Sequence, residues 1–283
     1  MAEDFNELVK LVGELPAMPV VVVKVLKIID DIDASTKQIA EPISHDPAVS
    51  ARILGIANSS FYGMRSKVTS LEHAINILGR KTLKVVVLEI SLKSVNKGYG
   101  NLDRLLWEKS IGCAIAARTL ALEFQAADAE LSFLGGLFSQ IGKMVLAGRY
   151  GRDYYQLVLE VAREGKDIAE AEKARFGFDH QAVGAAVLDK WGFAPLLIQS
   201  ALHKKELDFP ADVDETTRRV TAVVNIAEGL CTRLGIGQAA PDDEFDLASC
   251  RGLKALGLTA DGLEERLESF ESVYAQEKEM FAE

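Results

Sequence analysis

The sequence predicts an all-α protein that ends in a C-terminal amphipathic helix. Apolar residues recur at helical spacing in almost every segment, and only 7 prolines interrupt 283 residues. Strand-like alternation and repeats of 20–50 residues are both absent. Hydrophobic residues make up 48% of the chain, which supports a substantial core.

Helix-start signals divide the N-terminal subdomain into short helices. Ser and Thr caps, Asp as N-cap and Pro at a first helical position are typical of helix N-termini. In order, these signals are Pro19, Ser35 with Gln38, Asp46 with Pro47, and Thr69-Ser70 with Glu72. Gly79 is predicted to end the helix that follows the last signal. The run Val85–Ile90 is rich in β-branched residues, but its helical surroundings favour a buried helix.

A loop at Lys97–Asn101 is the predicted boundary between the subdomain and the bundle. The bundle helices are predicted near residues 105–124, 133–145, 153–164, 180–191, 195–204 and 214–234, with a last helix from Thr259 to about Phe281. Gly135-Gly136 lies inside the second of these helices, where each Gly costs about 1 kcal/mol relative to Ala. The pair therefore predicts a close helix–helix approach.

Charge and composition indicate which partners and which cellular compartment to expect. A net charge of −10 is a poor match for a nucleic acid backbone, so no nucleic acid partner is expected. Three cysteines without CxxC spacing indicate free thiols in a reducing compartment. The acidic N-terminus has no apolar signal core, and runs such as Val85–Leu88 are far shorter than the roughly 20 residues of a membrane span. We expect a cytoplasmic protein without membrane contact.

Few residues in the sequence directly indicate a catalytic or metal-binding site. His45-Asp46 is the only His-Asp doublet, but Pro47 follows it, so Asp46 is interpreted as a helix cap. His180 and His203 could share a metal, although a single His on an apolar helix face is more often a hydrogen-bonded core residue. Carboxylate pairs such as Glu170 with Glu172 are interpreted as solvated helix faces. No nucleophile motif, P-loop or dinucleotide fingerprint occurs.

Several motifs in order resemble the HDOD proteins, a bacterial group related to the HD and HD-GYP phosphohydrolases. They are Leu15–Pro19, Asp46–Val49, Ile56–Gly63, Leu71–Gly79, Trp107 with Ser110, Gly135–Leu137 and Trp191–Pro195. The match covers residues 12–211, and the resemblance implies an N-terminal helical subdomain at 12–97 packed on an HD-like helical bundle at 101–211. Residues 212–283 form a helical C-terminal extension.

The resemblance also implies where metal ligands would lie in catalytic HD relatives, whose helix reads aGLLHDiGK. The first histidine corresponds to Lys109, the His-Asp pair to Ser139 and Gln140, and a later histidine to His180. The paired histidines correspond to His203 and Lys204, and the last aspartate to Asn225. Serine and a neutral amide are poor metal ligands, and two lysines oppose a cation, so no metal and no cofactor are expected.

The resemblance implies bacterial signal transduction, with the chain as a stand-alone, non-enzymatic scaffold that binds signalling protein partners. Asn58, Tyr62 and Gly63 are the candidate partner surface. Two alternatives remain open: a divergent metal-dependent phosphohydrolase, and a sensor whose remnant pocket binds an anionic small ligand through Lys109 and Lys204.

Overall fold

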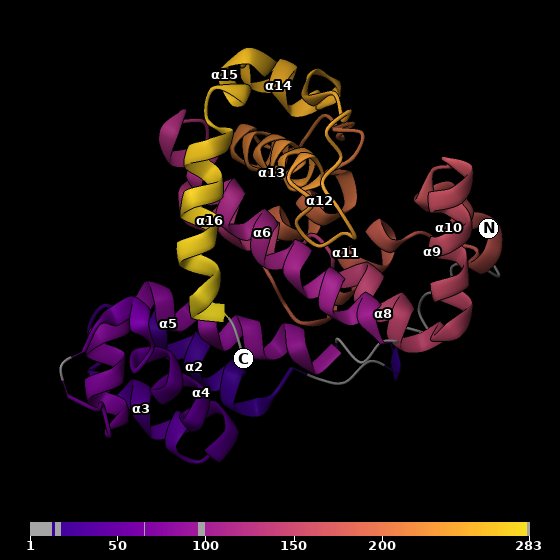
Figure 1. The fold of residues 1–283 in the computed structure, drawn as a ribbon. Helices are drawn as coiled ribbons and strands as arrows, with labels where there is room; N and C mark the ends of the chain where they lie inside the picture. The colour runs from indigo at the N-terminus through magenta and orange to yellow at the C-terminus, as the bar shows by residue number, and fades with distance from the viewer. Residues whose placement is uncertain (1–12, 15–17, 65, 96–99, 282–283) are drawn as a thin grey trace. The chain divides into compact units, whose positions relative to one another are not determined.

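The computed structural model describes residues 13–14, 18–64, 66–95 and 100–281, and these form helices and turns with no strand among them (Figure 1). The all-α prediction is therefore confirmed. The predicted loop at Lys97–Asn101 lies mostly outside the described residues. The chain divides into two compact units, Pro16–Ser94 with Ala275–Glu283, and Met1–Leu15 with Val95–Tyr274.

Helices between residues 20 and 95 form the core of the smaller unit. They are α2 (Val20–Ile29), α3 (Thr36–Ser44), α4 (Pro47–Ala57), the 3₁₀ turn η1 (Ser60–Tyr62) and α5 (Leu71–Val95). Val25, Ile43, Ile53 and Leu83 are buried between them. Burial of such aliphatic side chains is the main source of stability in a unit of this size.

Helix starts in this unit follow the predicted chemistry. Ser35 and Gln38 form both hydrogen bonds of a capping box. Asp46 accepts the amide hydrogens of Ala48 and Val49, so the His-Asp doublet is indeed a helix start. The cap of α5 differs by one residue from the prediction, because the Ser70 hydroxyl accepts the amide hydrogen of His73.

Gly79 separates two helices within the range of α5, with the non-helical angles φ 73° and ψ 163°, so the predicted helix end is confirmed. That left-handed φ suits glycine, which has no Cβ to clash. The helix resumes at once, so the run Val85–Ile90 is helical and buried in large part, as predicted.

The larger unit contains the remaining helices: α6 (Asn101–Glu123), α7 (Ala129–Leu137), α8 (Ile141–Tyr150), α9 (Arg152–Glu164), α10 (Ile168–Phe176), α11 (His180–Lys190), α12 (Pro195–His203), α13 (Glu215–Arg233), η2 (Leu247–Ser249), α14 (Arg251–Leu256), α15 (Ala260–Glu264) and the first half of α16 (Leu267–Phe281). α6, α7 and α13 pack on one another, and α11 packs on α8 and α12. This arrangement positions the polar residues described below.

Two glycines allow the close helix packing that was predicted. A Cβ on Gly136 would overlap with the Cys113 carbonyl oxygen and lie 2.7 Å from the Ala114 Cα, so α7 touches the α6 backbone there. A Cβ on Gly135 would lie 2.8 Å from a methyl carbon of Val224 on α13.

Two predictions about helix extent were wrong. The segment 133–145 is two helices, because the backbone turns at Phe138–Gln140 between α7 and α8. The last predicted helix divides into α15 and α16. Two helices, α10 and α14, were not predicted; α10 is capped by the Asp167 side chain, which accepts the amide hydrogen of Glu170.

Among the described residues, Ala129–Tyr150 is one stretch long and apolar enough to cross a membrane by length and composition alone. It corresponds to α7 and α8 together, and 83% of the apolar window is buried inside the fold. A buried helix pair in the core of a protein has the same composition.

Candidate functional site

The turn between α7 and α8 places Ser139 and Gln140 inside the larger unit. Both side chains are almost fully buried. The Gln140 amide donates a hydrogen bond of 2.7 Å to the Glu228 carboxylate on α13 and another of 3.1 Å to the Ser139 hydroxyl. The positions matched to the HD metal pair therefore hold each other through neutral hydrogen bonds.

Lys204, at the C-terminal end of α12, forms an ion pair with the same Glu228 oxygen. Only 4% of the Lys204 side chain and 23% of the Glu228 side chain are exposed. Burial raises the pKa of the Glu228 carboxyl, but the cationic charges of Lys204 and Lys143 outweigh it and hold that pKa below its usual range. The carboxylate is thus charged and neutralised by lysine.

Two further lysines belong to this group. The Lys109 ammonium donates to the Thr232 hydroxyl at 2.9 Å and to the Glu228 carbonyl at 3.3 Å. Lys143, on α8, is half-buried and makes no hydrogen bond or ion pair with any residue that the structure describes. We call Lys109, Ser139, Gln140, Lys143, Lys204, Glu228 and Thr232 the Glu228 cluster.

Burial lowers the pKa of Lys143, and the neighbouring ammonium of Lys204 lowers it further. Glu228 and Glu172 act in the opposite direction without reversing the shift. Among the lysines of the cluster, Lys143 is therefore the one whose positive charge is least balanced by neighbouring groups that the structure describes.

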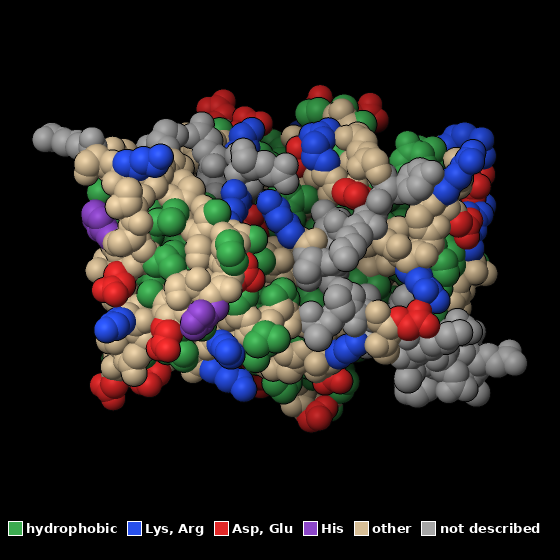
Figure 2. Space-filling view, turned by 90° about the horizontal axis from the view of Figure 1, so that it is seen from below, with side chains coloured by type: hydrophobic (Ala, Val, Ile, Leu, Met, Phe, Trp, Pro, Cys, Tyr) green, Lys and Arg blue, Asp and Glu red, His purple; other side chains and the backbone are tan. Residues whose placement is uncertain are grey.

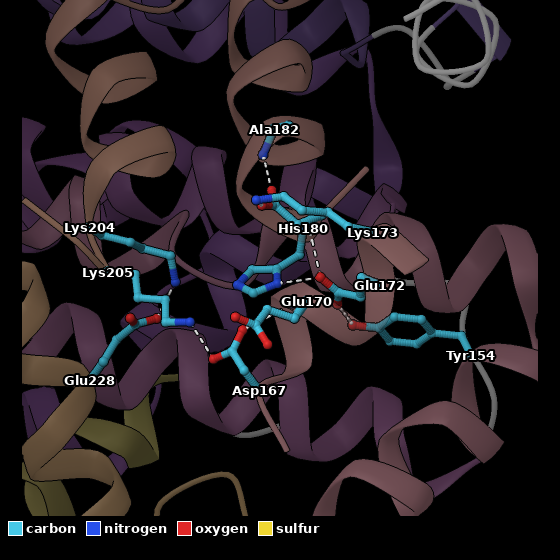
Figure 3. A network of polar contacts seen from close by, with 11 residues as sticks. Tyr154, Asp167, Glu170, Glu172, Lys173, His180, Ala182, Lys204, Lys205 and Glu228 are labelled. Atoms are coloured by element: carbon cyan, nitrogen blue, oxygen red, sulfur yellow. Dashed lines mark hydrogen bonds and ion pairs between the residues drawn. The ribbon is translucent and has the colours of Figure 1, made fainter. Parts of the chain in front are cut away.

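His180 lies beside this cluster and is held by a buried carboxylate (Figure 3). Its Nδ1 is 2.6 Å from Glu172 Oε2, and its backbone amide donates to the same oxygen at 2.8 Å. The Tyr154 hydroxyl donates to the other Glu172 oxygen at 2.7 Å. Asp179, which caps α11 and pairs with Lys173, fixes the start of the helix that carries His180.

The charge states of this pair follow from its surroundings. Burial lowers the pKa of His180, the nearby Lys143 lowers it further, and Glu172 opposes both effects without reversing them. Burial raises the pKa of Glu172, but the hydrogen bonds from His180 and Tyr154 hold it below its usual range. At neutral pH the pair is a neutral imidazole that donates from Nδ1 to a carboxylate, which leaves Nε2 as an acceptor.

The other two matched residues do not join these contacts. The His203 ring packs against Phe209, with 5.1 Å between ring centroids. Asn225 connects backbone segments: its amide donates to the Lys204 carbonyl at 2.9 Å, and its carbonyl accepts the Gly252 amide hydrogen at 2.9 Å. His180 and His203 therefore share no hydrogen-bonded arrangement.

Sequence reasoning missed four residues of this region. Glu172 was interpreted as part of a solvated helix face, which is wrong because its side chain is fully buried. Glu228, Lys143 and Tyr154 were not singled out. The Gly-Lys at the end of the HD-like motif could have indicated Lys143, whereas the other three become visible only when the helices are packed.

A divalent metal, which the catalytic HD relatives bind, does not fit these residues. Carboxylate and imidazole ligands would have to converge, but the Glu228 carboxylate is bound by an ammonium and an amide. In the described part of the chain, no three His, Cys, Asp or Glu side chains lie close enough to hold one metal together.

The candidate partner surface lies in the smaller unit. Asn58 closes a loop: its amide donates to the carbonyls of Leu54 and Val68, and its carbonyl accepts the Val68 amide hydrogen. Tyr62 forms an edge-to-face contact with Phe61, which is 44% exposed. Gly63 is exposed and has a positive φ of 54°, which continues the turn after η1.

The HDOD domain family model matches residues 15–207. The chain therefore belongs to the HDOD domain family, which is related to the HD phosphohydrolases and to signal-transduction proteins. A curated, uncharacterised protein of Treponema pallidum (strain Nichols) is 21% identical over 191 residues, and the match spans 67% of this chain but 37% of that protein.

Solved structures share the fold over nearly the whole chain. An HDOD domain protein of unknown function from Geobacter sulfurreducens is 24% identical, with a TM-score of 0.74 and coverage of 95% of this chain and 94% of that one. A protein from Shewanella amazonensis SB2B, provisionally named a phosphohydrolase, is 24% identical, with a TM-score of 0.73 and 98% coverage of both chains. A protein from Marinobacter aquaeolei VT8, provisionally named a signal transduction protein, is 19% identical, with a TM-score of 0.74 and coverage of 99% and 66%.

Proposed function

We propose that this protein is a non-enzymatic signal-transduction protein that acts through contacts with protein partners. The observation that carries the proposal is the ion pair between Lys204 and Glu228, with Gln140 as a second donor to the same carboxylate. The Lys204 ammonium takes the place of a cation that the protein would otherwise have to bind. The negative charge of Glu228 is thereby neutralised by a side chain of the same chain.

Ligand count supports the same conclusion. A hydrolytic metal site needs about three protein ligands and an open position for an activated water. Of the matched positions, only His180 and His203 carry a ligand, and His203 packs on Phe209 instead. Lys109 and Lys143 add positive charge that repels a divalent ion.

The loop after α4 supports contact with a protein partner. Phe61 is 44% and Met64 is 39% exposed, although side chains of this size are usually buried. Figure 2 shows hydrophobic side chains in small groups between charged ones on the face in view. We propose that Phe61, Tyr62 and Met64 contact the partner, while Asn58 holds their loop in shape.

One observation favours a second candidate function, the binding of an anionic small ligand. Lys109 and Lys204, which were expected to supply the charge, are bound to Thr232 and Glu228. Lys143 has no such contact among the described residues and lies near Lys204 and Lys109, whose charges lower its pKa. An anion at Lys143 would relieve this repulsion.

The deciding experiment measures bound metal and phosphodiesterase activity in full-length protein purified without chelator or metal affinity resin. We expect no stoichiometric Fe, Mn or Zn, and no turnover of nucleotides or cyclic dinucleotides above background. About one metal per chain with turnover, both lost in His180→Ala/His203→Ala, would show that the protein is an enzyme.

Partner contact is tested with a purified partner obtained by crosslinking from the native host. Phe61→Ser and Met64→Ser are expected to weaken its affinity while the melting temperature stays unchanged. Lys143→Gln serves as the control for that interface, since it lies in the other unit. The same Lys143 variant separates the second candidate, because it should abolish any thermal shift produced by inorganic phosphate.

A further inference from the structure

Two buried thiols face each other next to the Glu228 cluster. Cys113 on α6 and Cys231 on α13 have their sulfurs 3.8 Å apart, and neither side chain is exposed. A disulfide bond is about 2.05 Å long, so the sulfurs must approach by less than the width of one atom. Among the described cysteines, Cys250 is the remaining one, and it has no thiol contact.

Helix packing holds the backbone beside Cys113 against the Cys231 side chain. A Cβ on Gly112, next to Cys113, would lie 3.1 Å from the Cys231 sulfur. α7 also packs on this part of α6, since Gly136 rests on the Cys113 carbonyl. Because α6, α7 and α13 all pack on one another, the two thiols are held in van der Waals contact.

The two thiols have different acidities. Burial raises the pKa of Cys113, but the hydrogen bond between Cys113 and Cys231 and the Lys109 charge outweigh it, so the pKa is below its ordinary value. Burial and the neighbouring Cys113 raise the pKa of Cys231 well above its ordinary value. Cys113 is thus the more acidic of the two thiols and the expected nucleophile.

A chain of hydrogen bonds connects the thiols to the Glu228 cluster. The Ser139 hydroxyl is hydrogen-bonded to Cys113, and the Gln140 amide donates to Ser139 and to Glu228. Lys109 lies one helical turn before Cys113, and its partner Thr232 directly follows Cys231. A change in the sulfur–sulfur distance would be transmitted to the ion pair of Glu228 with Lys204.

We propose that Cys113 and Cys231 form a reversible disulfide, a redox modification site that crosslinks α6 and α13 beside the Glu228 cluster. This inference rests on the thiol geometry and holds whether or not the proposed function is correct.

The oxidant is a peroxide. The Cys113 thiolate attacks one peroxide oxygen, the O–O bond breaks, and the sulfur becomes a sulfenic acid while the leaving hydroxide takes a proton to form water. The Cys231 sulfur then attacks the Cys113 sulfur, the S–O bond breaks, and the departing hydroxide takes the Cys231 proton as a second water. In total two thiols lose two electrons, and one hydrogen peroxide becomes two waters.

Access is limited by burial, since the peroxide reaches the sulfurs only when the contact between α6 and α13 opens locally. Oxidation is expected to be slower than for an exposed thiol and to remain intramolecular, because a second chain cannot approach. Dithiothreitol should restore both thiols through the same opening.

The test oxidises folded, full-length protein with hydrogen peroxide, blocks free thiols in acid, and maps the digest by mass spectrometry. We expect a crosslinked peptide pair containing Cys113 and Cys231, with the chain lighter by two hydrogens and fully restored by dithiothreitol. Cys250→Ala is the matched control and should give the same crosslink, since Cys250 lies against Gly229 instead of the pair. Cys113→Ala and Cys231→Ala should give none.

The proposal is overturned if exhaustive oxidation of the folded wild type yields no Cys113–Cys231 peptide, a crosslink to Cys250, or only linked dimers. A second readout is independent of the variants. The oxidised wild type should melt at a higher temperature than the reduced protein, because the crosslink restricts the unfolded chain. A lower melting temperature in the crosslinked form would mean that the disulfide is damage instead of a built-in site.

Discussion

The ammonium of Lys204 contacts the carboxylate of Glu228 at the position where the HD resemblance places a metal-binding histidine. A positively charged side chain therefore replaces both a ligand and the ion that the ligand would hold. Gln140, in the place of the HD aspartate, donates to the same carboxylate at 2.7 Å. Lys204 and Gln140 thus replace two of the lost ligands with donors to the Glu228 carboxylate.

Removal of Lys204 should therefore destabilise the protein strongly. Lys204→Met leaves the Glu228 carboxylate without its cation, and loss of one partner of a buried pair costs about 3 kcal/mol. Urea unfolding monitored by circular dichroism measures this loss. Lys205→Met is the matched control, because the ion pair of Lys205 with Asp167 is far more exposed and should contribute less than about 1 kcal/mol.

A double-mutant cycle separates the ion pair from simple packing. Lys204→Met/Glu228→Gln removes both charges, so the double variant should be more stable than the sum of the two single losses predicts. Strict additivity of the two losses would mean that Lys204 acts by filling space and not by its charge.

Acid should weaken the protein through His180. Because the pKa of His180 is lowered in the folded state, the unfolded chain binds its proton first as the pH falls below about 6.5. The free energy of unfolding should then decrease as the pH falls, since stability declines wherever the unfolded state binds more protons. Glu172 and Glu228, whose pKa values are also lowered, add a further loss below about pH 4.5.

The measurement is urea unfolding at several pH values between 7.5 and 5.5. His180→Gln should be less stable than the wild type at pH 7.5 but show a flatter dependence on pH in this range. His73→Gln, which removes an exposed imidazole, is the control and should keep the slope of the wild type. If the free energy of unfolding of His180→Gln depends on pH as steeply as that of the wild type, groups other than His180 cause the acid sensitivity.

The sequence contained enough information for the fold, because capping residues and helical spacing are local. Ser35 with Gln38 and Asp46 with Pro47 act as helix starts, as their spacing predicts. The break at Phe138–Gln140 was not predicted, since apolar residues continue through it and the turn is stabilised by contacts of Gln140 with Glu228, 88 positions away.

Long-range contacts of that kind also explain why the sequence did not predict Glu228 and Glu172 as residues of the site. Ser139, Gln140 and Lys204 were identified by alignment with a motif, yet nothing local indicates that Glu228 joins them. Glu172 occupies a charged segment and resembles a surface residue, but its two oxygens are both bound by groups from α9 and α11. Only the packed helices reveal such a carboxylate.

Gly136 should be intolerant of a side chain. The added Cβ of Gly136→Ala would overlap with the Cys113 carbonyl and press on Ala114, so α6 and α7 would have to separate. Overpacking of this kind costs about 1–3 kcal/mol, measurable as a lower urea midpoint. Gly55→Ala is the control, since that helical glycine has open space around it and the substitution should stabilise by about 0.5–1 kcal/mol.

The last prediction separates the structural residue of the loop after α4 from its exposed neighbours. Asn58→Ala leaves the amide and carbonyl of Val68 without their partner, and Val68 is buried. Unsatisfied buried groups cost about 1–3 kcal/mol, so the melting temperature should fall clearly. Asn58→Asp retains the acceptor for the Val68 amide and should lose less. Phe61→Ser, which changes an exposed side chain, should stay within about 0.5 kcal/mol of the wild type. If Phe61→Ser destabilises as much as Asn58→Ala, Phe61 belongs to the core of the loop and the proposed partner surface is wrong.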